Sequence, residues 1–297
     1  MRKKCLLIGG CGFLLSNFVR KCLYAKDETL EFVTLDKLLY KHSIQNYYAN
    51  KHHKFHIGDV CDFHQLKSII DLEKPDIVIF GAGDKTISSI QTKLVGLNNL
   101  SKLSSQFERL IYLSSAKVSD YSDSEYYGPS NLQESFEYSS EIFIQNESKF
   151  NYNILRLSDV YGPRQPLTEQ IASRIFSALK GLEQIDNFNF LNPLFVDDFC
   201  SALMSVIEKG ENKERYSTEY FSSKYTNTDD IISLLTKIHL QTDVEIYTDN
   251  TIQIESRPGQ LLKNLGWSQQ ISLFEGLKET YNWYKNNSWF GRSNETI

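Results

Sequence analysis

The sequence has few of the features that mark secreted, membrane-embedded or nucleic-acid-binding proteins. Its five cysteines form no Cys-x-x-Cys pair, and an odd number argues against a secreted disulfide framework. No apolar run approaches the roughly 20 residues of a membrane span. The net charge is −5, with acids and bases interspersed, so the basic stripe of a nucleic-acid binder is missing. We expect a cytoplasmic protein with no nucleic-acid or membrane partner.

Leader and metal signals are also weak. The opening MRKKCLLIGGCGFLL imitates a signal peptide, but three glycines interrupt its apolar run and no small-x-small cleavage site follows. Five of the six histidines fall between His42 and His64, and His52 and His56 are four residues apart. Because no cysteine or carboxylate stands at ligand spacing, we expect no metal site.

Short apolar runs alternate with longer helical patterns over the first 165 residues. The runs are CLLIGG, EFVTLD, KFHIGD, DIVIFGAG, RLIYLSS and NILRLSDVYG, and each ends at turn-forming residues. Strands that are apolar throughout, with helices between them, are typical of a parallel sheet covered on both faces. The predicted fold class is therefore α/β, with a doubly wound parallel sheet in residues 1–165.

The pattern changes beyond Pro166. Helical spacing is followed by the strand-like FNFLNPLFVDD and then by mixed short strands and helices; the helical positions are Ile171, Ile175, Phe176 and Leu179. We expect residues 166–297 to form a smaller α/β lobe that binds substrate and is interleaved with the sheet domain.

A glycine cluster follows the first predicted strand and opens a helix. In LLIGGCGFLLS, Gly9, Gly10 and Gly12 would let a pyrophosphate approach backbone N–H groups at the positive helix end, next to Phe13. Asp36 ends the second predicted strand, where an acid can hydrogen-bond the adenosine ribose hydroxyls. The pattern predicts a Rossmann dinucleotide site; the alternative is the tight strand-helix turn of any α/β protein.

The predicted cofactor is NAD. Asp36 would repel the 2′-phosphate of NADP, although the neighbouring Lys37 weakens that preference and leaves NADP open. Asp59 in HIGDVCD, followed by Val60, would lie near the adenine edge. The alternative for Asp59 is an acid that caps the turn after a strand.

Eight ordered fragments span nearly the whole chain. They are GGCGF, LDKLLY, GDVCD, LSSAKV, YYGPS, LRLSDVYGPR, LFVDDF and LGW. In this order they resemble the extended short-chain dehydrogenase/reductases, the NAD-dependent epimerase/dehydratase family, and LDKLLY and GDVCD look most like its dTDP-glucose 4,6-dehydratase branch. The resemblance implies a dTDP- or UDP-hexose partner. It also implies NAD chemistry, in which a sugar hydroxyl is oxidised and the ketone is then epimerised, dehydrated or reduced.

The resemblance assigns catalytic roles residue by residue. Ser115 of LSSAKV takes the place of the Ser or Thr that hydrogen-bonds the reacting oxygen, and Tyr127 that of the tyrosinate base. Asn131 stands where the family has a lysine that holds the nicotinamide ribose and lowers the tyrosine pKa. A free tyrosine titrates near 10, so about one in a thousand is ionised at pH 7. Without another cation, turnover should be slow or absent.

Other candidates for the missing lysine exist. Further Tyr-x-x-x-Lys matches begin at Tyr47, Tyr220 and Tyr281, but none follows the fifth predicted strand and its serine. Lys93 of TKLVG stands where the family carries an asparagine before a Val-Gly step. As a hypothesis, Lys93 reaches the site and returns part of the missing charge; the alternative is an ordinary surface lysine.

Further departures affect cofactor placement, dehydration and the nucleotide side. Leu15 replaces the third glycine of the turn, where small size permits close helix-strand packing. Ala116 and Lys117 stand where the dehydratase branch carries the Asp-Glu pair for elimination. Leu191 replaces an arginine on the nucleotide side, while Arg257 of SRPGQ matches the other phosphate-contacting arginine. The alternative for Arg257 is a surface arginine in a Pro-Gly turn.

Two functions follow from these observations. The first is a nucleotide-sugar enzyme, a 4-epimerase or reductase rather than a dehydratase. The second is a catalytically impaired NAD-binding pseudoenzyme that acts as partner or regulator of an active homologue. On either, a homodimer is plausible through the helix at about residues 132–149, whose apolar face would equally suit a core-facing helix; that face carries Phe136, Phe143 and Ile144.

Overall fold

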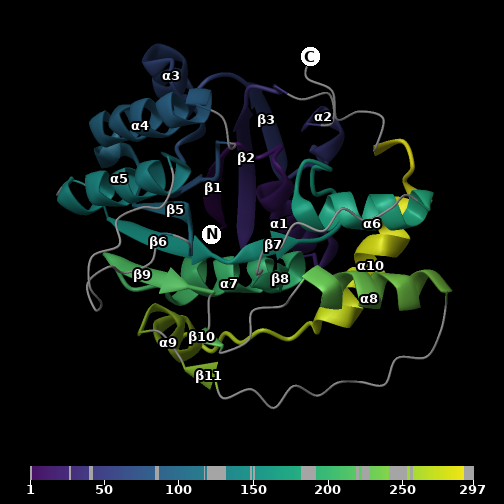
Figure 1. The fold of residues 1–297 in the computed structure, drawn as a ribbon. Coiled ribbons are helices and arrows are strands. Elements are labelled where there is room, and N and C mark those ends of the chain that lie inside the picture. Colours follow the sequence, from purple (N-terminus) through teal and green to yellow (C-terminus); the bar gives the residue numbers. More distant parts are fainter. Residues whose placement is uncertain are drawn as a thin grey trace.

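A parallel sheet of seven strands lies at the centre of the molecule (Figure 1). The computed structural model describes residues 2–26, 28–39, 43–83, 87–116, 118, 132–147, 149, 151–181, 192–218, 221–222, 228–240, 253–254 and 257–290. The strand order is β3-β2-β1-β4-β5-β6-β9. The strands are β1 (Lys3–Ile8), β2 (Leu30–Asp36), β3 (His53–Ile57), β4 (Ile77–Phe80), β5 (Arg109–Ser115), β6 (Tyr152–Leu157) and β9 (Glu214–Ser217).

The apolar runs of the sequence correspond to the first six of these strands, which confirms the predicted sheet. Alternate residues of one strand enter two different cores: Cys5 and Leu7 of β1 belong to one, Leu6 and Ile8 to the other. A strand buried on both faces has to be apolar throughout, which is why the runs do not alternate.

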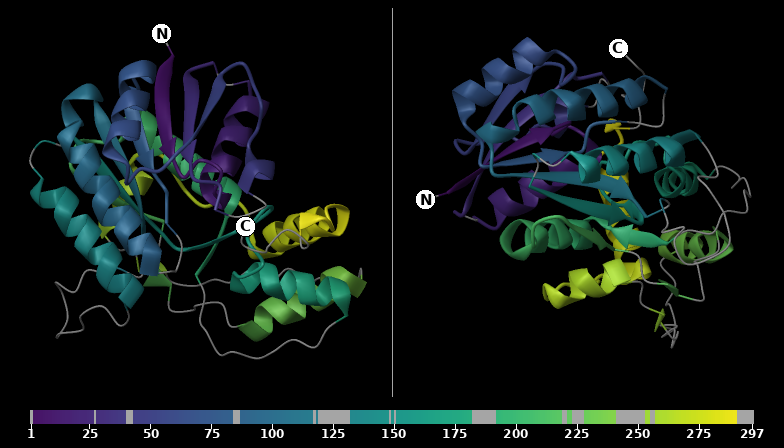
Figure 2. Two further views of the ribbon diagram at one scale, coloured as in Figure 1. Left: turned by 90° about the horizontal axis from the view of Figure 1, so that it is seen from above. Right: turned by 90° about the vertical axis from the view of Figure 1, so that its left-hand side faces the viewer.

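Helices cover both faces of the sheet (Figures 1 and 2). The helices α3 (Phe63–Glu73), α4 (Ile87–Lys102) and α5 (Leu132–Asn146) lie on one face. On the other face α1 (Phe13–Tyr24) packs against α7 (Val196–Lys209). The short helices α2 (Ser43–Asn46) and η1 (Ser104–Gln106) lie in connections. The described part of the chain contains no helix long and apolar enough to cross a membrane.

The elements beyond Pro166 divide between the sheet and a helical group. The strand β9 and the helix α7 belong to the sheet layers, so the sheet continues beyond residue 165. The division into a cofactor domain and a substrate lobe stays a prediction. The helices α6 (Gln170–Lys180), α8 (Thr228–Leu240) and α10 (Leu273–Asn286) pack together, while α9 (Arg257–Asn264) contacts β9. Two small sheets pair β7 (Asp159–Tyr161) with β8 (Pro193–Phe195) and β10 (Phe221–Ser222) with β11 (Gln253–Ile254).

The two predictions for the start of this region fare differently. The helical spacing corresponds to α6, where Ile171 and Ile175 are buried. The strand predicted over FNFLNPLFVDD is wrong at its end, because the strand β8 stops at Phe195 and α7 begins at Val196. The apolar residues before and after Asp197 and Asp198 belong to the buried face of α7 and not to a strand. Residues 188–191 of the predicted strand lie outside the described residues.

The fragments LFVDDF and LGW meet in a buried contact. The carboxylate of Asp198, 2% exposed, accepts the backbone N–H groups of Gln270 and Ile271 at 2.9 and 3.0 Å. The Trp267 indole N–H donates to the Asp198 carbonyl oxygen at 3.0 Å. These residues connect α7 to the segment before α10 and so stabilise the fold.

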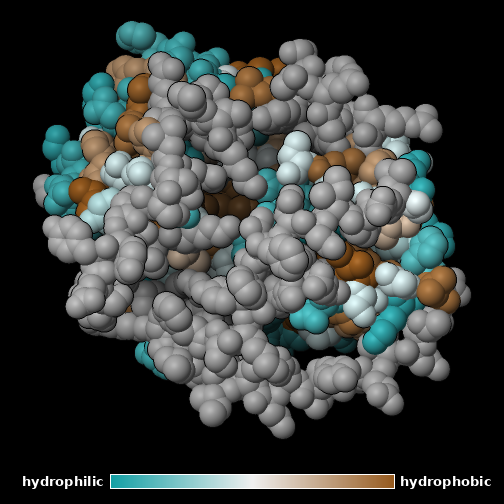
Figure 3. Space-filling view, in the orientation of Figure 1, coloured by the Kyte–Doolittle hydropathy of each residue, from teal (hydrophilic) through white to brown (hydrophobic). Residues whose placement is uncertain are grey.

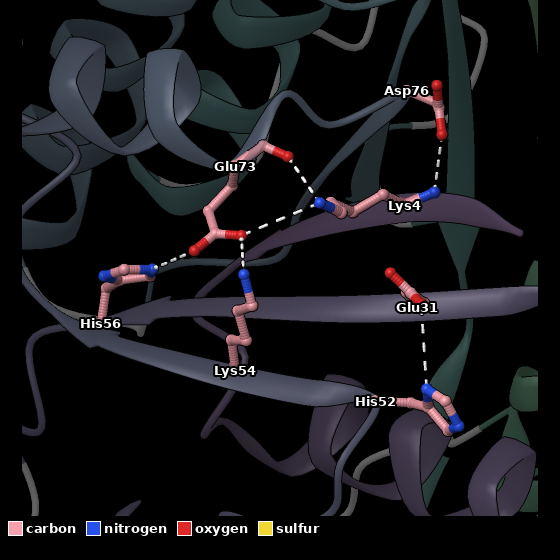
Figure 4. Close-up of polar contacts among 7 residues, drawn as sticks. All are labelled: Lys4, Glu31, His52, Lys54, His56, Glu73 and Asp76. Carbon is pink, nitrogen blue, oxygen red and sulfur yellow. Dashed lines mark hydrogen bonds and ion pairs between the residues drawn. The ribbon is translucent and has the colours of Figure 1, made fainter.

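A cluster of charged side chains joins α3 to the strands at one edge of the sheet (Figure 4). The Glu73 side chain is 3% exposed and accepts hydrogen bonds from Lys54 Nζ at 2.8 Å and His56 Nε2 at 3.1 Å. Lys4 Nζ lies 3.9 Å from the same carboxylate. Burial alone would raise the pKa of Glu73, but the bonds from Lys54 and His56 outweigh it and leave the pKa below the ordinary value.

The two histidines spaced four residues apart do not converge. His56 contacts Glu73, whereas His52 lies 3.7 Å from Glu31 (Figure 4). Among the residues that the structure describes, no group of three or more His, Cys, Asp or Glu side chains is placed to hold a metal ion.

The first prediction concerns Glu73→Gln. The variant leaves Lys4, Lys54 and His56 without their carboxylate, so the free energy of unfolding at pH 7 should fall by about 1–3 kcal/mol. Because the folded pKa lies below the ordinary 4.5, the stabilisation is present above that pH and is lost as pH falls through the folded pKa. Urea denaturation should therefore show the difference shrinking towards about pH 3.

A matched control is Glu28→Gln, since the Glu28 side chain is 85% exposed and pairs only loosely with Arg2. This variant should change little at either pH. A loss from Glu73→Gln that is the same at both pH values would contradict the linkage.

Candidate active site

The strand order places a crevice at the carboxyl ends of β1 and β4. From β1 the chain winds towards β2 and β3, and from β4 it winds the other way towards β5 and β6. The connections therefore leave in opposite directions at this point, which is where open α/β sheets bind ligands. The glycine turn after β1 lies at this position.

The glycine turn has no room for side chains. Gly9 has a φ of +79°, and a Cβ there would lie 2.8 Å from the Cα of Ala82. A Cβ on Gly10 would lie 2.3 Å from Thr34 Oγ1. Gly12 is the N-cap of α1; it offers no side-chain cap, and the first turn holds no acidic residue. The start of α1, including Phe13, is thus an uncapped helix N-terminus suited to an anion.

The leucine at the third glycine position is accommodated by a glycine elsewhere. Leu15 is 1% exposed and belongs to the core between α1 and the sheet. A Cβ on Gly81, which follows β4, would lie 2.9 Å from Leu15 Cδ1. The close approach of α1 to the sheet is thus permitted by Gly81 after β4, instead of by a small residue at position 15 of the helix.

Asp36 connects the end of β2 to the glycine turn. Its Oδ2 accepts the Cys11 N–H at 2.9 Å, and its Oδ1 accepts the Leu38 N–H at 2.8 Å. Burial raises the pKa of Asp36, and these two bonds oppose the shift. The carboxylate lies directly beside the turn, so the residues present fit the adenosine and pyrophosphate half of a dinucleotide.

Asp59 pairs with the lysine that follows Asp36. Lys37 Nζ lies 2.7 Å from Asp59 Oδ2, and the Cys61 N–H donates to Asp59 Oδ1 at 2.8 Å. Burial acts to raise the pKa of Asp59, but the Lys37 and Cys61 bonds outweigh it and lower the pKa. Val60 is 3% exposed and belongs to the core. An adenine contact from Asp59 or Val60 stays a prediction.

The structure describes part of the predicted catalytic group. Ser115 ends β5 at the carboxyl edge of the sheet, opposite Leu157 of β6. Tyr127, Asn131 and Lys117 lie outside the described residues. Ala116 is 8% exposed, and its N–H donates to the Leu157 carbonyl at 2.8 Å. The catalytic assignments therefore stay predictions.

Lys93 is a buried residue in an ion pair. It is 9% exposed on α4, and its ammonium donates to Glu137 of α5. The other Glu137 oxygen accepts the Tyr112 hydroxyl at 2.7 Å. Burial and the nearby Glu137 raise the pKa of Tyr112 well above its ordinary value. The ordinary surface lysine is thus excluded, and the role of Lys93 in catalysis stays a hypothesis.

A second carboxylate repeats this arrangement one helical turn later on α5. Glu141 is 1% exposed and accepts Arg156 Nε at 3.0 Å on Oε1 and Nη2 at 2.8 Å on Oε2. Ser114 Oγ donates to Glu141 Oε1 at 2.6 Å. Sequence reasoning missed both carboxylates. The available signal was a pair of acids spaced i, i+4 on a helix, with an arginine inside an apolar strand.

The nucleotide side of the site is described only in part. Arg257 opens α9, but its side chain is not among the described ones, and Leu191 lies outside the described residues. Asp159, where the family usually carries an asparagine, accepts the Asn192 N–H at 2.9 Å on Oδ2. The Asp159 carboxylate therefore fixes the backbone between β7 and β8. Contact of Arg257 with a diphosphate stays a prediction.

The outer face of α5 is mixed in character. Ile144 is fully buried and Phe143 packs against the same core, whereas Tyr138 and Ile142 are 42% and 38% exposed. Hydrophilic and hydrophobic residues alternate over the area of α3 to α5 in the space-filling view (Figure 3). The apolar residues Phe143 and Ile144 thus serve the core, and the homodimer stays a prediction.

Comparisons with known proteins point to one family. The model of the NAD dependent epimerase/dehydratase family matches residues 5–218. The chain is similar to the dTDP-D-glucose 4,6-dehydratases of Bos taurus and Homo sapiens. Each is 27% identical over 322 aligned positions that cover 96% of this chain, and 89% and 91% of those proteins respectively.

Solved structures share the fold. The dTDP-glucose 4,6-dehydratase of Bacillus anthracis in complex with NAD has a TM-score of 0.82 and 21% identity, covering 99% of this chain and 100% of that one. The UDP-glucose 4-epimerase of Thermotoga maritima with UDP-glucose has a TM-score of 0.79 and 21% identity, covering 96% and 99%. These likenesses confirm the predicted Rossmann α/β fold.

The buried pairs of α5 give the second prediction. Arg156→Met leaves the Glu141 carboxylate buried without its cation, so the free energy of unfolding should fall by about 3–5 kcal/mol in urea denaturation. Arg156→Met combined with Glu141→Leu removes both charges and should recover much of that loss. The control is Lys67→Met, which removes an exposed ion pair with Asp71 on α3 and should cost about 0.5 kcal/mol or less. Equal effects of Arg156→Met and Lys67→Met would contradict the prediction.

Proposed function

Because the chain belongs to the NAD dependent epimerase/dehydratase family, we propose that it binds NAD and a nucleotide sugar and transfers hydride at a sugar hydroxyl. The reaction is a 4-epimerisation or a reduction rather than a dehydration. The observation that carries this proposal is the cradle for the adenosine and pyrophosphate half of the cofactor, in which an uncapped helix start lies beside Asp36. A dTDP- or UDP-hexose is the substrate class, as in the relatives' names.

The chain's residues have separate tasks in this proposal. Bound NAD supplies a hydride acceptor. Backbone N–H groups at the start of α1 hold the pyrophosphate, and Asp36 holds the adenosine ribose. Ser115 hydrogen-bonds the reacting hydroxyl, and Tyr127 takes its proton. Asn131 holds the nicotinamide ribose without adding charge, and the guanidinium of Arg257 binds the sugar-nucleotide diphosphate.

The sequence disfavours dehydration, because Ala116 and Lys117 stand where the dehydratase branch carries its Asp-Glu pair. Elimination of water needs a group that removes a proton and one that protonates the leaving hydroxyl. The methyl side chain of Ala116 can do neither, and the residue is buried, with its N–H bonded to the Leu157 carbonyl of β6. Epimerisation and reduction need only hydride and proton transfer at one carbon. The hydride would be exchanged with the nicotinamide, while Ser115 and Tyr127 would position the hydroxyl and move its proton.

A second candidate is a catalytically impaired relative that binds NAD and acts as partner or regulator of an active homologue. The observation that favours it is the pairing of Lys93 with Glu137. The charges of this pair cancel, and Tyr112 occupies the remaining carboxylate oxygen. Lys93 then contributes little positive potential to replace the family lysine at Asn131.

Product analysis separates the two candidates. Wild type and Asn131→Lys are incubated with NAD and dTDP-glucose, UDP-glucose, UDP-galactose or their N-acetyl counterparts. Parallel incubations supply NADH and the corresponding 4-keto sugars to detect reduction, and the products are separated by chromatography. Slow conversion by wild type, faster in the variant, is the expected result. Because an unassisted tyrosine ionises near pH 10, the wild-type rate should rise about tenfold per pH unit above 7, and the variant's less steeply.

The control is Tyr127→Phe, which should abolish conversion in both backgrounds, and NADH binding is measured on each preparation. If wild type binds NADH but converts nothing, while Asn131→Lys converts, the impaired relative is the better account. Conversion that survives Tyr127→Phe would contradict the catalytic assignment.

A further inference from the structure

Three charged residues lie at or just beyond the neighbouring carboxyl ends of β2 and β3, where the cofactor's adenosine ribose is expected. The Asp36 carboxylate is bonded to the backbone of Cys11 and Leu38. The next residue, Lys37, extends its ammonium to Asp59 Oδ2 at 2.7 Å. The Lys37 and Asp59 side chains are 29% and 38% exposed, so solvent reaches the pair.

The backbone imposes this pairing. Asp36 of β2 lies opposite Ile57 of β3, and the Gly58 N–H donates to the Asp36 carbonyl at 3.0 Å. The chains that leave both strands therefore begin side by side, which brings Lys37 next to Asp59. The Cys61 N–H donates to the other Asp59 oxygen at 2.8 Å. This bond orients the carboxylate independently of Lys37.

We propose that Asp59 is a specificity-determining residue for the cofactor, because it holds the Lys37 ammonium away from the 2′-phosphate of NADP. This inference rests on the cofactor half of the proposed function and not on turnover. Without Asp59, the flexible side chain of Lys37 could turn its ammonium towards a phosphate on the ribose beside Asp36. With Asp59 present, the Lys37 ammonium is already paired with a carboxylate of the protein.

The charge balance supports this role. Two carboxylates, Asp36 and Asp59, and one ammonium leave a net charge of −1 beside the ribose position, which repels a phosphate dianion. Neutralising Asp59 brings the sum to zero and frees Lys37. The ordinary alternative is that the pair only connects β2 to β3. In that case losing Asp59 would affect stability and leave the choice of cofactor unchanged.

The ratio of two affinities isolates the effect. NADH and NADPH share the adenine ring, so an interaction of Asp59 with adenine would strengthen the binding of both nucleotides alike and cancel in their ratio. Asp59→Asn is the suitable variant, because its amide oxygen can still accept the Cys61 N–H. Fluorescence titration of the full chain with each reduced nucleotide gives the two dissociation constants without any turnover.

Asp59→Asn should shift the NADH to NADPH affinity ratio towards NADPH by about tenfold, the worth of one charge-assisted contact. Lys37→Met alone takes the local charge to −2 and removes a lysine that is already engaged, so it should give no gain for NADPH and leave the ratio unchanged or further towards NADH. Lys37→Met added to Asp59→Asn should remove the gain. The matched control, Asp71→Asn, deletes the same charge from an exposed pair with Lys67 and should not shift the ratio.

The result that would overturn the inference is an unchanged ratio in Asp59→Asn while NADH binding persists, or a gain that survives Lys37→Met. Either of these outcomes leaves the proposed function intact. A wild type that binds neither nucleotide would overturn this inference together with the cofactor half of the proposed function.

Discussion

The two carboxylates that α5 buries against the sheet constrain the region where chemistry is expected. A buried carboxylate without a cation and a hydrogen-bond donor costs several kcal/mol. The helix α5 can therefore pack on the sheet only in a position where Glu137 and Glu141 both meet their partners. Those partners come from α4, β5 and β6. Four elements are thereby held in one arrangement. Because α5 begins at the residue after Asn131, the predicted catalytic segment is attached directly to this rigid unit.

The cofactor end of the crevice depends on a different kind of contact. There the backbone itself is packed tightly, with Gly9 against Ala82 and Gly10 against Thr34, and Asp36 joins β2 to the turn. The glycine turn and Asp36, which fit the adenosine and pyrophosphate half of a dinucleotide, depart from the family pattern only at Leu15. The other changes, at Asn131 and Lys93, concern the residues expected near the chemistry. A fold of this kind hosts several functions, so an altered catalytic group on an intact cofactor domain is physically reasonable.

Much of this architecture could be predicted from the sequence because burial on both faces makes parallel strands continuously apolar. The strand β9 escaped prediction, since it lies at the end of the described sheet, beside β6, and reads Glu-Arg-Tyr-Ser with Tyr216 in the core. The glycine turn and Asp36 were recognisable because their spacing is local. The compensation of Leu15 by Gly81 was not, because the two positions meet only in the folded chain.

The charged partners of Lys93 were hidden for the same reason. A lysine in a sequence carries no mark of whether it is exposed or paired, and Glu137 lies 44 residues away on another helix. Ser115, Tyr127 and Asn131 were named from a resemblance to a family, and the family itself is confirmed. The roles of these three residues are predicted from their places in the family's motifs. A structure with bound ligand would test those roles.

A crystal structure of the wild-type chain with NAD would examine the cofactor cradle most directly. We expect the pyrophosphate to lie against the backbone N–H groups at the start of α1, and the adenosine ribose hydroxyls to lie within hydrogen-bonding distance of Asp36. A nucleotide bound elsewhere, or a ribose turned away from Asp36, would contradict the proposed cradle.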